Sequence, residues 1–273
     1  MTTDAINCHP TQPQKTTFLS LSKLATMQRN LHTIPSEMLF DGTIPASAAD
    51  IVLTDLEVAA SAGLSEWQKA RLGKITASRF GLVKKLKTGN WGETALSYLY
   101  DLIGEHLTGQ PSQTFTGNDA TEWGNEYEAE ALEAYTKRTG RKVKTANTFL
   151  QHPDLPLVGG TPDALCGERG VIEVKCPFTF KNHLRTVITK TVPDEYLHQV
   201  YGQLWLSGRD WADFVSYDPR IPKKHAAARL VIVRVERKNI NLAYLEQDIY
   251  EFHELLLKKL AALKVKPGKN IQL

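Results

Sequence analysis

Two acids and a lysine lie at a spacing that suits metal-dependent attack on a phosphodiester. Asp163 follows Pro162, nine residues separate it from Glu173, and Lys175 comes two positions later. Two hard carboxylates with open coordination positions favour Mg²⁺, with Mn²⁺ as a substitute, over Zn²⁺. Such a metal acidifies water and stabilises charge on a phosphate, while a neighbouring lysine orients the nucleophile. The pattern predicts Asp163 and Glu173 as metal ligands and, with Lys175, as catalytic residues.

A β-hairpin is the element that would bring these groups together. We expect strands over 158–165 and 170–177, joined by a turn at 166–170. Side chains alternate along a strand, so Glu173 and Lys175 share one face while Ile172 and Val174 point into an apolar layer. Asp163 then meets Glu173 across the pair, and the backbone carbonyl of Val174 becomes a candidate third ligand. The alternative is an exposed strand on which Glu173 and Lys175 form only an ion pair.

Five sequence blocks surround these residues and extend from about Glu66 to Arg220. They read WQKARLGKITAS (67–78), WGNEYE (123–128), EVKCPF (173–178), HQVYGQLW (198–205) and YDPR (217–220). In this order they resemble the phage lambda-type exonucleases, the YqaJ-like viral recombinase family of the PD-(D/E)xK nuclease superfamily. The resemblance implies an α/β fold with a central mixed β-sheet flanked by helices.

The resemblance also adds a carboxylate that spacing does not select. It implies that Glu128 contributes to catalysis and could support a second metal. Without it, Glu122, Glu126, Glu130 and Glu133 on the same predicted helix are equal candidates. On composition alone each of these acids is ordinarily a solvated helix residue.

A pocket for the DNA 5′-phosphate is implied in the same way, formed by Arg71, Ser78, Thr161 and Gln199. Arginine suits this role because its guanidinium binds phosphate oxygens bidentately. Thr161 keeps a hydroxyl where the family often has serine. The structural alternatives are a surface salt bridge for Arg71 and a helix N-cap for Ser78.

Three further residues near these blocks receive structural interpretations or none. We interpret Trp67 as a core residue rather than a DNA contact. His198 is interpreted as structural, as lone helical histidines usually are. Tyr196 could approach the active site, but the sequence assigns it no role.

The resemblance implies a Mg²⁺-dependent, processive 5′→3′ exonuclease on double-stranded DNA ends. It would degrade the 5′-phosphorylated strand and leave 3′ overhangs for phage-type recombination by strand annealing. A homotrimeric ring around the DNA and a phage-type single-strand annealing protein as partner are implied with it. Two alternatives remain, a structure-selective or site-specific endonuclease of the same fold and an inactive DNA-end-binding module. The intact set of Asp163, Glu173 and Lys175 argues against the inactive module.

Composition is compatible with these expectations. A chain of 273 residues with 42% apolar content can bury a sizeable core, and a net charge of +3 does not indicate a DNA-coating protein. Three cysteines, Cys8, Cys166 and Cys176, are too few for a four-cysteine iron–sulfur cluster and do not form a disulfide framework. With no signal peptide or membrane-spanning run, we expect a cytoplasmic protein. The family resemblance implies that the cell is a bacterial host and that the gene belongs to a phage or prophage.

The chain divides into two predicted parts. Residues 1–60, rich in Thr, Ser, Ala and Pro, predict an N-terminal extension, either a partly ordered arm or a tail, before a single nuclease domain over 61–273. In that domain we expect a helix with a capping box from Ser65 to Gln68, further helices from Thr76 and over 92–107, 120–139, 195–206 and 242–263, and strands over 211–217 and 229–235. The last helix carries an apolar stripe that we expect in the core, formed by Leu245, Ile249, Phe252, Leu256 and Leu260.

Basic residues form three clusters that could contact a phosphate backbone. Each is ordinarily a solvated face. They are Lys84, Lys85 and Lys87; Lys137, Arg138, Arg141, Lys142 and Lys144; and Arg220, Lys223 and Lys224.

Overall fold

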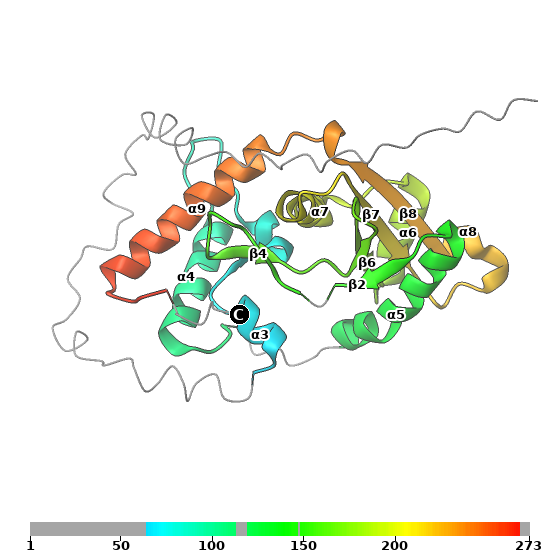
Figure 1. Cartoon of the computed structure of the whole chain (residues 1–273), viewed down its shortest axis with the longest axis horizontal. Helices are drawn as coiled ribbons and strands as arrows, with labels where there is room; N and C mark the ends of the chain where they lie inside the picture. The colour runs from blue at the N-terminus through cyan, green and yellow to red at the C-terminus, as the bar shows by residue number, and fades with distance from the viewer. Residues whose placement is uncertain (1–63, 113–118, 147, 268–273) are drawn as a thin grey trace, which may run out of the picture. The chain divides into compact units, whose positions relative to one another are not determined.

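The predicted acids lie on a five-stranded sheet. The computed structural model describes residues 64–112, 119–146 and 148–267. Within them the sheet has the strand order β2-β5-β6-β7-β8 (Figure 1). The strands β6 and β7 run parallel and the other neighbours are antiparallel, so the expected mixed sheet is confirmed. The five strands are β2 (Val143–Thr145), β5 (Ala164–Cys166), β6 (Gly170–Lys175), β7 (Trp211–Tyr217) and β8 (Leu230–Glu236).

The predicted first hairpin strand, 158–165, is wrong as a single element. Its beginning is β4 (Val158–Gly160), which lies in a separate three-stranded sheet between β1 (Ile75–Thr76) and β3 (Leu150–Gln151). Only its end is β5, which pairs with β6. The break falls at Pro162, which has no N–H to donate to a strand ladder.

The register of β5 and β6 brings the two acids next to each other. Ala164 is paired with Ile172, and the N–H of Asp163 donates to the carbonyl of Ile172 over 3.2 Å. The pairing therefore continues to Asp163, which lies beside Glu173. This part of the predicted hairpin, including its turn, is confirmed.

Two helices cover the opposite faces of this sheet (Figure 1). On one face, α5 (Asp119–Thr139) packs Ala131, Leu132 and Tyr135 against a cluster that contains Ile172 and Val174. On the other face, α7 (Asp194–Ser207) packs Val200 and Leu204 against a cluster that contains Val171 and Phe214. The alternation along β6 thus gives each helix its own set of side chains.

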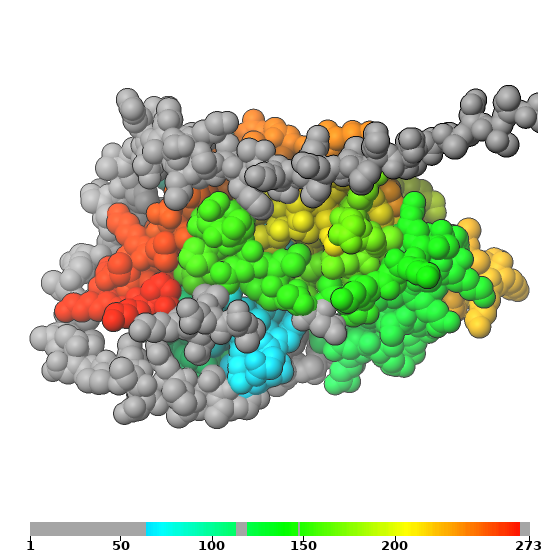
Figure 2. All heavy atoms as spheres, viewed as in Figure 1, coloured from blue at the N-terminus to red at the C-terminus, as the bar shows by residue number. Residues whose placement is uncertain are grey.

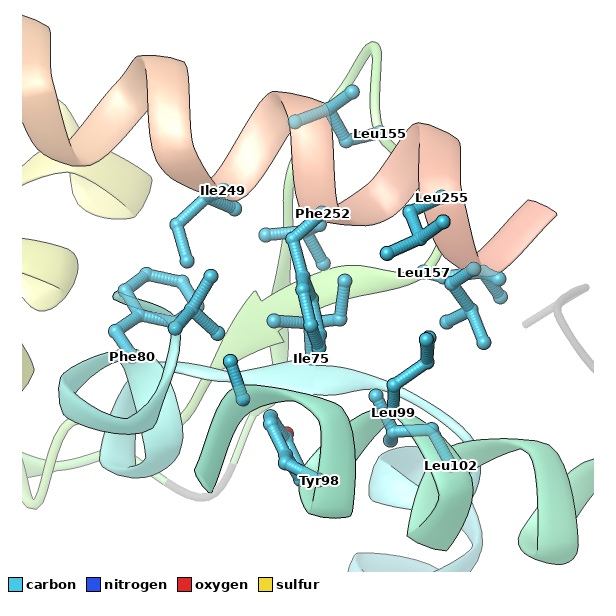
Figure 3. Packing of buried hydrophobic residues seen from close by; sticks show 14 of the residues in the cluster. Ile75, Phe80, Tyr98, Leu99, Leu102, Leu155, Leu157, Ile249, Phe252 and Leu255 are labelled. Atoms are coloured by element: carbon cyan, nitrogen blue, oxygen red, sulfur yellow. The ribbon is translucent and has the colours of Figure 1, made fainter. Parts of the chain in front are cut away.

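A second core lies between α4 (Glu93–Thr108), α9 (Ala243–Ala262) and the three-stranded sheet. Figure 3 shows Phe252 of α9 pointing between Ile75 and Tyr98, and the rings of Phe252 and Tyr98 stack at 5.9 Å. The predicted stripe on the last helix is confirmed as core, because all five of its residues belong to this cluster. They are Leu245, Ile249, Phe252, Leu256 and Leu260.

The remaining helical segments are shorter. The capping box at Ser65 is present, with Gln68 as its partner, and opens α3 (Glu66–Arg71). The segment after Thr76 forms a 3₁₀ helix, η4 (Ala77–Leu82), and a short helix that the sequence did not predict, α6 (Phe180–Thr189), follows β6. The last short elements are η5 (Lys223–His225), α8 (Ala226–Arg229) and η6 (Arg237–Asn239).

Some expectations lie outside the described part of the chain. The predicted extension over residues 1–60 and its boundary fall there, as does Cys8. Cys166 and Cys176 are buried free thiols. Among the described residues, no helix is both long and apolar enough to cross a lipid bilayer.

Candidate active site

A pocket of about 550 Å³ is lined by residues of α3, η4, α5, β2, β6 and α7 and of the connection between β4 and β5. It collects most of the residues that the sequence singled out. Both α3 (cyan) and α5 (green) reach the surface on the face that Figure 2 shows. The lining residues are Trp67, Arg71, Ser78, Asn125, Glu128, Thr145, Ala146, Thr161, Pro162, Asp163, Glu173, Lys175, Gln199 and Gln203.

The acids and the lysine form a connected group at the end of β6. Lys175 Nζ donates to Glu173 Oε1 over 2.6 Å, which places both side chains on one face of the strand as expected. The backbone N–H of Val174 donates to Asp163 Oδ2, also over 2.6 Å. Glu173 is 1% exposed, so its charge is held inside the protein.

Three carboxylates share this region with a single lysine. Burial and then the charge of Glu173 raise the pKa of Asp163 well above its ordinary range, although Lys175 opposes them. The same two causes raise the pKa of Glu128. Burial alone would lower the pKa of Lys175, but Glu173 and Asp163 outweigh burial and raise it. Lys175 is therefore a cation at neutral pH.

Glu128 is distinguished from the other acids of α5 by its position. It lines the pocket and is half-buried, whereas Glu122, Glu126, Glu130 and Glu133 are exposed. Glu130 has partners elsewhere, since it accepts hydrogen bonds from Tyr217 and Arg229.

Arg71 and Ser78 lie together at the same pocket. Arg71 Nη2 donates to Ser78 Oγ over 2.9 Å and to Thr76 Oγ1 over 3.3 Å. The guanidinium also lies 4.6 Å from the ring centre of Trp67. The ring of Trp67 and the hydroxyls of Thr76 and Ser78 therefore hold Arg71 in one orientation.

The two glutamines of α7 connect this arrangement to the acids. Gln199 donates to Glu173 Oε1, and Gln203 Nε2 donates to the carbonyl of Thr161 over 2.9 Å. The Oγ1 of Thr161 and the Oε1 of Gln203 are buried, and neither has a hydrogen-bond partner among the described residues. The pocket therefore offers unused polar atoms next to Asp163.

The family model of the YqaJ-like viral recombinase domain matches residues 66–210, more than half of the chain. The chain belongs to this family. An alkaline exonuclease (LHK-Exo) from Laribacter hongkongensis is similar in structure, with a TM-score of 0.65 and 35% sequence identity over 73% of this chain and 95% of that chain. Its complex with dAMP matches equally well. The resemblance inferred from the five blocks is confirmed.

A more distant structure shares the fold. It is a phage related exonuclease from Haemophilus somnus 129PT, with a TM-score of 0.55 and 19% identity over 68% of this chain and 96% of that chain. A comparison with curated protein sequences gives no match.

The carboxylates of this YqaJ-like domain fit a hard divalent cation. Asp163 and Glu173 lie side by side, and burial together with the charge of Glu173 raises the pKa of Asp163. A cation would relieve the repulsion between the two acids. Among the described residues no group of three or more His, Cys, Asp or Glu side chains is arranged to hold a metal ion. The fit is thus to two carboxylates completed by other oxygen atoms, such as the carbonyl of Val174 and water.

Sequence reasoning misplaced one residue of the domain and missed others. The interpretation of Trp67 as core is wrong, because it is 49% exposed and lines the pocket beside Arg71. Gln203 and Asn125 were not singled out, although both lie within the quoted blocks. Tyr196, which received no role, places its ring 5.4 Å from Lys175 Nζ. His198 is half-buried and does not line the pocket.

Several of the predicted basic residues have structural partners instead. Lys85 pairs with Glu251, and Arg138 donates to the carbonyl of Ala226. Arg220 is bound by Asp218 and donates to the carbonyl of Phe178. These three cations stabilise tertiary contacts of the domain.

Proposed function

We propose that this protein is a Mg²⁺-dependent 5′→3′ exonuclease that degrades the 5′-phosphorylated strand of duplex DNA and leaves a 3′ overhang. The observation that carries the proposal is that one pocket joins Asp163, Glu173 and Lys175 to the Arg71–Ser78 pair. Membership of the YqaJ-like family supports the exonuclease activity, as does the 35% identity to an alkaline exonuclease.

Some residues of the pocket would carry out the chemistry, and others would bind the end of the DNA strand. The cation would be held by Asp163, Glu173 and the carbonyl of Val174. Glu128 lies close enough to interact electrostatically with Asp163. When bound, Mg²⁺ would supply an acidified water and neutralise charge on the scissile phosphate. Lys175 stays protonated, so it orients the nucleophile and stabilises charge rather than acting as a general base.

The binding half of the pocket would recognise the end of the strand. Arg71 and Ser78 supply a cation and a hydroxyl for the terminal 5′-phosphate, and Thr161 adds a second hydroxyl that has no hydrogen-bond partner among the described residues. Gln199 contacts Glu173 directly and would couple phosphate binding to the position of that acid. A phosphate held here sets which bond is placed at the acids, which is how an exonuclease selects the terminal nucleotide.

The biological setting is part of the same proposal. Family membership supports a role in phage-type recombination by strand annealing, with a single-strand annealing protein as partner. A homotrimeric ring around the DNA would explain processive digestion by enclosing the substrate. Analytical ultracentrifugation of the full chain tests whether the assembly has the mass of a trimer.

Digestion of end-labelled linear duplexes in Mg²⁺ tests the function. The two ends are labelled separately and carry either a 5′-phosphate or a 5′-hydroxyl, and a covalently closed circle and an EDTA control run alongside. We expect progressive loss from phosphorylated 5′ ends, an intact circle and no digestion in EDTA. Cutting of the closed circle would indicate an endonuclease of the same fold, and absence of any Mg²⁺-dependent cleavage would indicate a DNA-end-binding module.

A further inference from the structure

The two phosphate-binding candidates are separated by a short turn of chain. Arg71 is the last residue of α3, and Ser78 lies in η4. Their hydrogen bond can form only if the backbone between them folds back, and Gly73 provides this change of direction with a φ of +67°. The orientation of Arg71 therefore depends on what fixes the turn at Gly73.

Consecutive residues of α4 bind both polar groups of the Gly73 backbone. Glu105 Oε2 accepts from the N–H of Gly73 over 2.7 Å, and His106 Nε2 donates to its carbonyl over 2.9 Å. A Cβ atom at position 73 would lie 2.7 Å from the imidazole ring of His106, so the contact requires glycine. The turn is held by a helix that does not line the pocket.

A third side chain of α4 holds the strand that follows the turn. The hydroxyl of Tyr98 accepts from the N–H of Thr76 over 3.2 Å and donates to the carbonyl of Lys74 over 3.3 Å. Tyr98 and Glu105 are seven residues apart, which places them on one face of the helix. This face therefore holds the bend at Gly73 and the chain that follows it, up to Thr76, which Arg71 contacts.

Glu105 is itself fixed in place. Its second oxygen accepts from both the N–H and the hydroxyl of Ser112, each over 3.1 Å. Its negative charge also acts on Arg71, since burial lowers the pKa of Arg71 and Glu105 is one of the groups that oppose this. Glu105 thus combines a geometric and an electrostatic effect on a pocket that it does not enter.

We propose that Glu105 and His106 are positioning residues for recognition of the terminal phosphate, acting through Gly73 on Arg71. This rests on the proposed function of the pocket. Because the two residues act on the binding half and not on the acids, their loss should reduce discrimination between 5′-phosphate and 5′-hydroxyl ends. A residue that only stabilised the fold would lower both rates together.

The test is the ratio of kcat/KM for 5′-phosphorylated and 5′-hydroxyl duplex ends. We expect Glu105→Ala to lower this ratio about tenfold, as for loss of one hydrogen bond to a charged group, mainly through a higher KM for phosphorylated ends. Glu105→Gln keeps an oxygen acceptor for the Gly73 N–H and should retain most of the preference. Glu93→Ala removes an exposed acid from the first turn of the same helix and should leave the ratio unchanged.

Thermal unfolding of each variant accompanies the assay. If Glu105→Ala is unfolded at the assay temperature, His106→Ala carries the test, because it removes only the bond to the Gly73 carbonyl. An unchanged ratio in a folded variant would overturn the positioning role and leave the proposed exonuclease intact. A lack of phosphate preference in the unmodified enzyme would overturn the pocket itself and the positioning role with it.

Discussion

The ammonium group of Lys175 donates to the buried carboxylate of Glu173 over 2.6 Å. The ion pair is therefore part of the pocket wall and not the pair on an exposed strand that a Glu-x-Lys pattern ordinarily forms. Gln199 donates to the same oxygen of Glu173, so that carboxylate links the lysine to α7. A substitution at Lys175 should therefore have separate effects on the cleavage rate and on the stability of the fold.

Lys175→Ala should lower single-turnover cleavage by about 10²–10³-fold, the usual effect of losing one preorganised charge-stabilising group. Binding of a 5′-phosphorylated duplex, measured by fluorescence anisotropy, should be retained because Arg71 and Ser78 are untouched. Lys181→Ala, at an exposed lysine of α6, is the control. Unaltered turnover in Lys175→Ala would remove the catalytic role.

Divalent cation should stabilise the folded protein, because it would relieve the repulsion between Asp163 and Glu173. Mg²⁺ at a hundred times its Kd would add about 2.7 kcal/mol to the free energy of unfolding. Asp163→Asn should abolish this gain while raising the melting temperature in EDTA, since it removes one of the repelling charges. The measurement is thermal unfolding with and without Mg²⁺.

The matched control for this measurement is Glu168→Gln. Glu168 is an exposed acid in the turn of the same hairpin. The Glu168→Gln variant should keep the full stabilisation by Mg²⁺. An equal response in Asp163→Asn would show that the cation binds elsewhere.

Local sequence patterns predicted the parts of the site that depend on short-range geometry. The alternation along β6 placed Glu173 with Lys175, and the capping residues placed the start of α3. The separation of β4 from β5 was not predictable in this way. Pro162 marks where the strand is interrupted, but β4 pairs with β1, where Val158 is the partner of Ile75, more than eighty positions earlier in the chain, and local periodicity carries no information about such a partner.

Side-chain environments at the pocket were also beyond the sequence. Tryptophan is usually buried, but Trp67 lies on the exposed side of a six-residue helix that contributes no buried residue. Gln203 appears in the HQVYGQLW block one helical turn after Gln199, a spacing that places both on one face of α7. That spacing was the available signal for Gln203.

Two acids of α5 should give different outcomes when neutralised. Glu128→Gln should lower the cleavage rate about 10- to 100-fold, as is usual for groups that support a metal site. Glu130→Gln should lower the melting temperature with little effect on rate, because Glu130 accepts from Tyr217 and Arg229 away from the pocket. Steady-state kinetics and thermal unfolding of both variants separate the two effects.

Glu133→Gln serves as the reference for this pair, because Glu133 is exposed on the same helix and does not line the pocket. Glu133→Gln should change neither the cleavage rate nor the melting temperature. If Glu128→Gln behaves like Glu133→Gln, the carboxylate of Glu128 has no part in catalysis.

Mild acid should destabilise the core between α9 and the β3–β4 segment. Burial lowers the pKa of both His152 and His253 in the folded state. An unfolded histidine, with a pKa of about 6.5, gains its proton first as the pH falls. The unfolded state then binds more protons than the folded state, so the free energy of unfolding should decrease from about pH 6.5 downward until the folded-state pKa values are passed.

Urea unfolding at a series of pH values between 7.5 and 5.0 measures this decrease. His253→Gln should make it shallower, because the variant lacks one of the histidines whose pKa is lowered by burial and which therefore gain a proton on unfolding. His225→Gln, at an exposed histidine of η5, should leave the slope unchanged. The same slope in His253→Gln as in the unmodified protein would mean that other groups cause the acid sensitivity, because the protons taken up on unfolding would then not belong to His253.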